Sequence, residues 1–335
     1  MHQSAIWLSE QDVAALVSLD DIIGELEFGM RALGEEKGFN IPKALGTIDA
    51  ASSMHSLGSA LTGARVCGYK NWINTPRGAK ALFVLFDSHE GRLLAFMEAN
   101  VLGQLRTSAM TGLGTKWMSP GDVDDMAIIG SGRQALAQIA AVNLVRPLKR
   151  LRVWSPTEEK RRAFCVQARQ HFPAEIVEAP TLEEALREAP LVTTVTRART
   201  PFLHANMLAK GAHLNAVGAI LPANAEFHQD VFERAGMIAV DDVANTRKAS
   251  REFIDQFGDG DWSRVRPLGE LIATGERRPH DADITLFKSM GMGISDLSVA
   301  ALAYRRAQAA GLGKEIPLTT GAKLRWSSSQ AAEAN

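Results

Sequence analysis

The 335-residue chain has only two cysteines, no long apolar run and no excess of charge of either sign. Cys67 and Cys165 lie far apart and form no C-x-x-C pair, which argues against both a disulfide framework and a cysteine-rich zinc site. No apolar segment reaches the roughly 18 residues of a membrane-spanning helix. Residues 1–17 lack the basic start and the continuous apolar stretch of a secretory signal. We therefore expect a cytoplasmic protein.

Charge and missing motifs exclude several further classes of protein. The 37 lysines and arginines are balanced by 38 aspartates and glutamates, so the total charge does not favour a polyanionic partner. The basic run at 146–152 contains no aromatic residue that would stack on bases, and neither a nucleic acid nor a membrane is expected as a partner. The histidines, His204 and His213 among them, show no metal-ligand spacing, so we expect no metal. Hydrolase and P-loop motifs are absent as well.

Hydrophobic residues make up 46% of the chain and charged residues 22%, the balance of a folded protein with a sizeable core. The length favours two domains. In the first third, apolar residues at helical spacing predict a helix over 9–33, with Ser9 and Asp12 at its start. Short β-like runs follow, at 44–49, 64–71, 81–86 and 93–97. The last two predict a hairpin, in a sheet that could close on a partner subunit.

Beyond residue 122 the pattern changes, after a helix predicted over 106–118. Apolar strands now alternate with helices, with strands predicted at 126–129, 152–154, 191–195, 214–217 and 237–240 and helices at 134–145 and 158–169. This alternation predicts an α/β fold with a doubly wound parallel sheet. A last helix is predicted over 296–310, and the tail from Ser327 onward is small and polar.

A glycine-rich turn carries the most specific chemical signal. The strand at 126–129 runs directly into a G-x-G-x-x-A sequence that spans residues 130–135 and opens a helix. Gly130 permits the tight turn, and Gly132 lets the backbone approach a pyrophosphate. The helix N-terminus adds free N–H groups and a partial positive charge. We expect Gly130, Gly132, Arg133 and Gln134 to bind a dinucleotide.

The second strand of this series indicates which dinucleotide. NAD sites place an acidic residue about 20 residues after the turn, to bind the ribose 2′-hydroxyl. Here the strand ends in Ser155 and Thr157 with no carboxylate, and Lys160 and Arg161 follow in the next helix. Small hydroxyl residues leave room for a 2′-phosphate, and the basic residues supply charge for it. NADP(H) is therefore favoured over NAD(H), although Glu158 and Glu159 leave open that the two cations form only a solvated helix face.

Further short motifs occur along the chain, at 68–71, 85–87 followed by Gly91, 105–109, the turn at 130, 214–218, and 286–291 followed by Asp296. In these segments and their order the sequence resembles the ornithine cyclodeaminase and mu-crystallin family. The similarity extends from about residue 40 to about residue 315. Together the motifs are specific for the family but not for one reaction, since the family contains cyclodeaminases, ketimine and cyclic-imine reductases, and L-amino-acid dehydrogenases.

The resemblance implies a homodimer in which a Rossmann domain, residues 123–296, is inserted into a dimerisation and substrate domain formed by 1–122 and 297–335. It also implies that Lys70 and Arg106 face the nicotinamide and bind the substrate carboxylate. Chemistry agrees, because arginine binds a carboxylate in a bidentate manner and a lysine can donate a proton. If Lys70 is the acid, Arg106 should lower its pKa. Further cofactor contacts are implied at Thr196, Val217 and Ser289.

Two departures from the family pattern bear on the reaction. Lys43 stands where many members carry an arginine, and it is a further candidate for binding the carboxylate. A lysine lacks the planar, two-pronged donor geometry of an arginine. Ile220 stands where cyclodeaminases carry an aspartate that handles the substrate amine. Because isoleucine transfers no proton, the departure argues against ornithine cyclodeamination and leaves hydride transfer intact. Asp296 is similar to an acidic residue of the family. The helix dipole already accounts for an aspartate at this position, because a negative charge is favourable in the first turn of a helix.

We therefore predict an enzyme, an NAD(P)H-dependent reductase of a small imino acid such as a cyclic Δ1-imine-2-carboxylate. Arg106 and Lys70 would hold the imine carbon near the nicotinamide, which supplies the hydride. An L-amino-acid dehydrogenase and an ornithine cyclodeaminase are the enzymatic alternatives, and a crystallin-like protein that binds a small ligand or NADP(H) is the non-enzymatic one. Trp72, Phe39 and Met54 are candidates for the lining of the substrate pocket.

Overall fold

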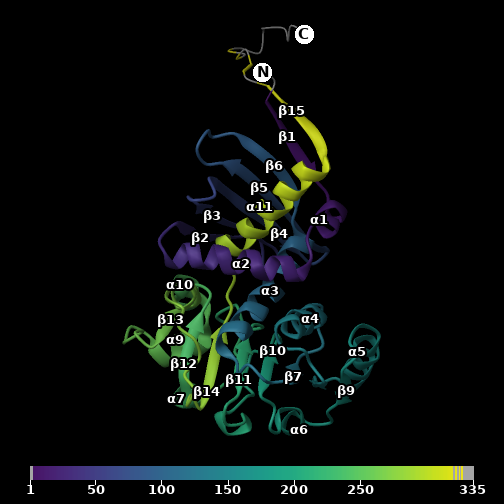
Figure 1. Ribbon diagram of the computed structural model, residues 1–335, viewed down its shortest axis with the longest axis vertical. Coiled ribbons are helices and arrows are strands. Elements are labelled where there is room, and N and C mark those ends of the chain that lie inside the picture. The colour runs from purple at the N-terminus through teal and green to yellow at the C-terminus, as the bar shows by residue number, and fades with distance from the viewer. Residues whose placement is uncertain (1–2, 320, 323, 325, 327–335) are drawn as a thin grey trace.

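Two β-sheets follow one another along the long axis of the computed structural model, which describes residues 3–319, 321, 322, 324 and 326 (Figure 1). The predicted tail from Ser327 onward lies outside the described residues. The first sheet has seven strands in the order β15-β1-β6-β5-β4-β3-β2. Its strands are β1 (Gln3–Leu8), β2 (Gly38–Thr47), β3 (Ser53–Leu61), β4 (Val66–Thr75), β5 (Gly78–Asp87), β6 (Leu93–Glu98) and β15 (Lys314–Leu318).

The predicted hairpin is confirmed as the antiparallel pair β5–β6, which places Phe83 opposite Met97. Asp87 holds its turn, because one carboxylate oxygen accepts from the N–H groups of His89 and Glu90. Gly91 completes the turn at φ +70°, a conformation that favours glycine. Of the other strands of this sheet, β1, β3 and β15 are absent from the sequence prediction.

The second sheet confirms the predicted fold class, because all of its eight strands pair in parallel, in the order β13-β12-β14-β11-β10-β7-β8-β9. Helices flank the sheet, as expected for a Rossmann-type fold. The strands are β7 (Asp125–Ile129), β8 (Arg150–Trp154), β9 (Glu175–Glu178), β10 (Leu191–Thr194), β11 (His213–Ala216), β12 (Ala235–Val240), β13 (Val265–Pro267) and β14 (Ile284–Lys288). The helices are α4 (Ala135–Val145), α5 (Glu158–His171), α6 (Leu182–Leu186), α7 (Asp230–Arg234), α8 (Val243–Ala249), α9 (Arg251–Phe257) and α10 (Leu268–Thr274).

The single helix predicted over 9–33 is wrong, because the structure has two helices there, α1 (Glu10–Leu16) and α2 (Leu19–Gly34). Ser18 causes the break. Its hydroxyl accepts from the N–H of Asp21 while the Asp21 carboxylate accepts from the N–H of Ser18, so the pair forms a capping box that starts a new helix. The predicted start at Ser9 and Asp12 is confirmed as the same motif.

Two long helices, α3 (Asn100–Met118) and α11 (Gly293–Ala310), join the parts of the molecule. α11 lies over the first sheet, and α3 runs from that sheet toward the second one (Figure 1). Close packing holds α3 there, since a Cβ at Gly114 would lie 2.4 Å from the Phe287 ring of β14. One apolar core includes both Phe83 of the first sheet and Phe287 of the second. The division into domains at residues 122 and 296 stays a prediction.

Candidate active site

A cavity of about 890 Å³ lies where β4 and α3 meet the carboxyl ends of the parallel strands. Most of the cofactor- and substrate-binding residues predicted from the sequence lie in its wall, together with Trp72 and Ile220. The predicted residues in the wall are Lys43, Lys70, Arg106, Gly130, Gly132, Arg133, Gln134, Ser155, Thr157, Lys160, Thr196, Val217 and Ser289. The position agrees with the general rule that open α/β sheets bind ligands outside the carboxyl ends of their strands.

The glycine turn has the geometry that a pyrophosphate requires. Gly130 has φ +119°, and its N–H donates to the carbonyl of Trp154 at 2.8 Å, which ties the turn to β8. A Cβ at Gly130 would lie 2.8 Å from the carbonyl oxygen of Val195, whereas one at Gly132 would meet nothing within 4 Å. α4 begins behind the turn without a side-chain cap. The N–H of Ala135 donates to the Gly132 carbonyl, whereas the next N–H groups of the first turn have no acceptor within the helix and can bind an anion. The residues present therefore fit a dinucleotide.

The β8 end of the cavity is neutral or basic. Thr157 and Lys160 are exposed in its wall, while the buried Ser155 hydroxyl accepts from the Ser131 hydroxyl at 3.0 Å. The prediction that Arg161 supplies charge to a phosphate is wrong. Its guanidinium is buried, donates to the carbonyl of Ser155 at 2.9 Å and lies 3.4 Å from Glu178. A residue of α5 that faces the sheet cannot face a ligand as well.

Lys70, Arg106 and Asp296 form an ionic cluster at the other end, in which Lys70 and Asp296 are buried and Arg106 is partly buried. Asp296 Oδ1 accepts from Lys70 Nζ at 2.6 Å and from Arg106 Nε at 3.2 Å. Lys70 projects from the middle of β4, and Arg106 lies in the second turn of α3. Asp296 lies in the first turn of α11, as its predicted role at a helix start requires, but it also orients both cations. The guanidinium Nη atoms have no ion-pair partner in the described part of the chain and are available to a carboxylate.

Burial lowers the pKa of Lys70 to about 8, with Asp296 opposing the shift and Arg106 adding to it. The expected direction of the pKa shift is therefore confirmed, although burial contributes more to it than the charge of Arg106 does. A lysine with this pKa holds a proton at neutral pH and gives it up more readily than a solvated lysine does.

Trp72 forms the wall beside the two lysines. Its ring lies 5.4 Å from Lys43 Nζ and 5.1 Å from Lys70 Nζ, and the His55 ring stacks on it with centroids 4.6 Å apart. Burial also lowers the pKa of Lys43. The other two residues predicted for this pocket, Phe39 and Met54, do not line the cavity. Phe39 lines a separate hollow on the first sheet, and Met54 is exposed.

An acidic residue that was not predicted from the sequence shapes the loop before α11. The buried Asp241 carboxylate accepts from the Ser289 hydroxyl and from the N–H groups of Met290 and Gly291. Gly291 has φ +83°, and a Cβ there would lie 2.9 Å from Arg106 Nη1. Asp241 thus fixes the loop that packs against the arginine. Its position directly after the buried strand β12 is the signal that could have found it.

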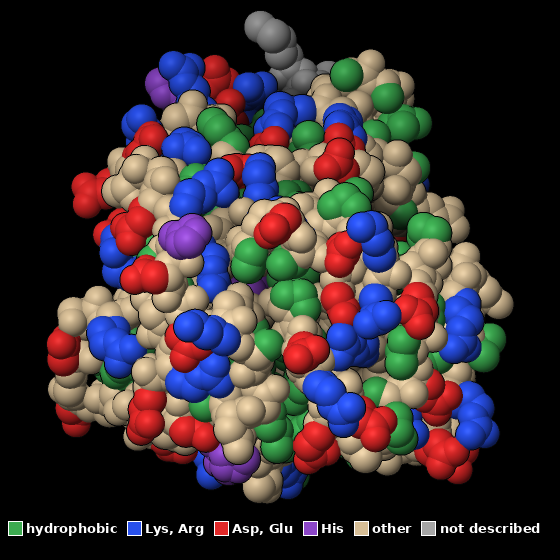
Figure 2. Space-filling model, turned by 60° about the horizontal axis from the view of Figure 1, so that its bottom comes forward, with side chains coloured by type: hydrophobic (Ala, Val, Ile, Leu, Met, Phe, Trp, Pro, Cys, Tyr) green, Lys and Arg blue, Asp and Glu red, His purple; other side chains and the backbone are tan. Residues whose placement is uncertain are grey.

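The other polar residues singled out in the sequence bind partners within the protein itself. His213 is buried and bonds to Thr285 and Asn215. In the basic run at 146–152, Lys149, Arg150 and Arg152 pair with acidic residues, and Arg146 donates to main-chain carbonyls. Figure 2 shows basic and acidic side chains interspersed over one face of the molecule. Across residues 3–319 and the few described beyond them, no three potential metal ligands cluster and no helix is long and apolar enough to cross a membrane.

Residues 6–311 match the sequence model of the ornithine cyclodeaminase/mu-crystallin family. A Delta(1)-pyrroline-2-carboxylate reductase of Bacillus cereus is 28% identical over 92% of this chain and 98% of its own. The ketimine reductase mu-crystallin of Mus musculus is 31% identical over 78% of this chain and 79% of its own.

Among solved structures, a Delta(1)-pyrroline-2-carboxylate reductase of Thermococcus litoralis, in complex with NADH and L-proline, superposes with a TM-score of 0.86 at 25% identity, over 92% of this chain and 99% of its own. An archaeal alanine dehydrogenase, a dimer with bound NAD, gives 0.86 at 25% identity, over 95% and 100%. The sequence motifs, the parallel sheet and these similarities agree, and the chain belongs to the ornithine cyclodeaminase/mu-crystallin family.

Proposed function

We propose that the protein is an NADPH-dependent reductase of a cyclic imino acid, a Δ1-imine-2-carboxylate. The charge of the cavity carries the proposal. Six cations line it, namely Lys43, Lys70, Arg106, Arg133, Lys160 and Arg197, and within the described part of the chain no carboxylate does. Such a wall favours two anions, a phosphorylated dinucleotide and a small carboxylate. The names of the relatives support the choice of an imine as substrate.

Arg106 and Lys70 have distinct tasks in this reaction. The free Nη side of Arg106 binds the substrate carboxylate, and Asp296 holds the guanidinium in the required direction. Lys70 adds a second charge there and is the proton donor to an imine nitrogen that arrives unprotonated. The bound nicotinamide supplies a hydride from C4, whose electron pair forms the new C–H bond as the C=N π pair moves to nitrogen. The products are a cyclic amino acid, which has gained the hydride and a proton, and the oxidised cofactor.

Ile220 separates this reaction from the alternatives within the family. Its side chain is partly exposed in the cavity wall, where it offers no group that accepts a proton from an amine. Reduction of an imine needs no such group, whereas cyclodeamination and the water addition of an amino-acid dehydrogenase need a base. The test is a screen of reduced cofactor with cyclic imino acids, and of oxidised cofactor with ornithine, alanine and arginine. Turnover in the second set alone would contradict the proposal.

Preference for NADPH is expected to depend on Lys160, which lines the β8 end of the cavity with Thr157. Replacing Lys160 by glutamate places a negative charge where a 2′-phosphate would bind. We expect the KM for NADPH to rise by about tenfold or more, and the KM for NADH to change by less than about twofold. Steady-state kinetics with both cofactors measure this effect. An equal rise of both KM values would assign Lys160 to the part that the two cofactors share.

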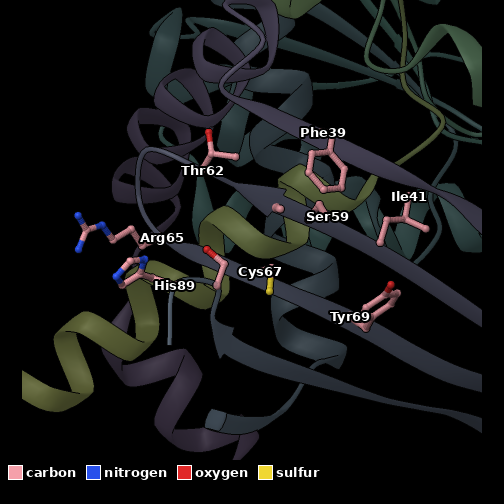
Figure 3. Close-up of a pocket in the computed structure, with 10 residues that line it drawn as sticks. Phe39, Ile41, Ser59, Thr62, Arg65, Cys67, Tyr69 and His89 are labelled. Carbon is pink, nitrogen blue, oxygen red and sulfur yellow. The ribbon is translucent and has the colours of Figure 1, made fainter. Parts of the chain in front are cut away.

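We further propose that the protein is a homodimer that uses the outer face of the first sheet. Figure 3 shows Phe39, Ile41 and Tyr69 on that face. These residues line a hollow of about 530 Å³. Phe39 is 52% exposed and Tyr69 40%, and Ile73 of the same strand is exposed as well. Contiguous apolar side chains of this kind mark an interface in soluble proteins.

Phe39→Asp is expected to convert the dimer into a monomer, because a charge buried at the centre of an apolar interface has no partner. Leu144→Asp introduces the same charge at an exposed position of α4 and should leave the mass unchanged. Light scattering coupled to gel filtration distinguishes the two results. A dimeric Phe39→Asp variant would place the interface elsewhere.

A further inference from the structure

Behind the cavity, a buried glutamate joins two loops that follow neighbouring strands. Glu226 is fully buried. One of its carboxylate oxygens accepts from the N–H of Thr196 at 2.6 Å, in the loop after β10. The other accepts from the N–H groups of Gly218 and Ala219 at 2.9 and 3.2 Å, in the loop after β11. The hydroxyl of Thr194 completes the set at 2.9 Å. Oxygens that accept several N–H bonds in this way belong to an ionised carboxylate.

The charge of Glu226 is not neutralised by a neighbouring cation. In the described part of the chain no lysine, arginine or histidine forms an ion pair with it. The nearest cation on this network is Lys288, whose ammonium lies 3.4 Å from Glu252 and donates to the carbonyl of Ala219. Glu252 in turn accepts from the N–H of Glu226. One buried ammonium therefore serves two buried carboxylates, and a net negative charge remains.

The strand order places this charge behind one half of the cavity. β7 with its glycine turn is an inner strand of the sheet, with β8 on one side of it and β10 and then β11 on the other. The β8 half carries the residues predicted for the adenosine end, so the β10 and β11 half, toward Lys70 and Arg106, is left for the nicotinamide. Thr196 and Gly218 line that half, and a Cβ at Gly218 would lie 2.3 Å from Glu226 Oε1. Main-chain N–H groups of two residues that line the cavity thus donate directly to this carboxylate.

We propose that Glu226 is a positioning residue that fixes both loops of the nicotinamide half and, through its negative charge, favours the oxidised cofactor over the reduced one. The proposal rests on the proposed function, because it requires a nicotinamide in this half. Loss of a hydride turns a neutral dihydropyridine ring into a cationic pyridinium ring. A fixed negative charge stabilises that cation, and the positive charge that develops during hydride transfer, without having to reorganise.

The two effects can be separated by measuring affinity for both redox forms of the cofactor. Fixing the loops increases the affinity for both forms of the cofactor, whereas the negative charge increases only the affinity for the oxidised form. In Glu226→Gln we expect both dissociation constants to rise, and the one for NADP⁺ to rise about tenfold more than the one for NADPH. Glu226→Asp keeps the charge and shortens the reach to the loops, so both constants should rise by the same factor. Fluorescence or calorimetric titration of the purified protein, without substrate, gives all of these values.

Two further variants keep the test decisive. Glu252→Gln removes one negative charge and leaves the contacts of Glu226 to the loops in place, so it should shift the ratio of the two constants in the same direction as Glu226→Gln. Glu233→Gln is the matched control, because Glu233 is exposed on the neighbouring helix α7 and should leave the ratio unchanged. A ratio that stays within about twofold of wild type in both Glu226→Gln and Glu252→Gln overturns the proposal. Failure of the wild-type protein to bind either form would instead contradict the proposed function.

Discussion

Replacing Arg106 by alanine is expected to lower kcat/KM for a cyclic imino acid by about three orders of magnitude. The guanidinium has lost most of its water, with its side chain only 15% exposed, and it is oriented by Asp296. Removing one partner of such a charge-assisted contact costs about 2–5 kcal/mol, and each 1.4 kcal/mol is a factor of ten in rate. Steady-state kinetics at saturating NADPH measure the loss.

Two control variants give this result its meaning. Arg106→Lys keeps the charge and loses the fork, so it should recover part of the activity and remain well below wild type. Arg305→Ala removes an arginine of α11 whose ion pair with Glu25 is solvent-exposed, and it should be neutral. If Arg106→Ala left kcat/KM within a factor of a few, the carboxylate would have to bind elsewhere in the cavity.

The second large effect is expected at Lys70, whose loss should lower kcat by about a hundredfold or more, the usual contribution of a positioned proton donor. Lys70→Met keeps the length of the side chain and removes the proton. Because burial lowers the pKa of Lys70 to about 8, wild-type kcat/KM should fall as the pH rises through about 8. This limb of the pH profile should be missing in Lys70→Met.

Asp296→Asn tests the same assignment without altering Lys70. Asp296 raises the pKa of Lys70 against the effect of burial. Its loss should therefore move the alkaline limb to lower pH, so that the variant loses more activity at pH 8 than at pH 6. If the alkaline limb stayed at its wild-type position, it would report the titration of a group other than Lys70.

Much of the second sheet could be predicted from the sequence, because parallel strands buried on both faces are continuous apolar runs such as 126–129 and 237–240. The first sheet was harder to predict. β3 consists largely of small and polar residues, Ser53, His55, Ser56 and Gly58 among them, and its β-propensity is weak. β1 and β15 pair with each other across almost the whole length of the chain, a contact that no local pattern reveals.

Glycine turns and family motifs are local signals, and most of the residues that they indicated line one cavity. The acidic residues behind the cavity wall were not predicted. Asp241, Glu226 and Glu252 act through main-chain N–H groups and through Lys288, and these partners become neighbours only when the strands align. A weak signal was present in Lys288, since a lysine at the end of the apolar run 284–287 must find a buried partner. Arg161 is the opposite case: it was predicted to face the ligand and instead faces the sheet. The spacing of residues in the sequence does not show which side of a helix is turned toward the sheet.

The most direct test of the account follows a single hydrogen atom. The purified protein would be mixed with NADPH that carries deuterium at C4 of the nicotinamide, in separate preparations labelled on each face, and with Δ1-pyrroline-2-carboxylate. Mass spectrometry of the product would follow. We predict proline that carries one deuterium on the α-carbon, from one of the two labelled cofactors only, and none in Arg106→Ala over the same time. Unlabelled proline, or no proline at all, would contradict a reductase that transfers a hydride to an imine carbon.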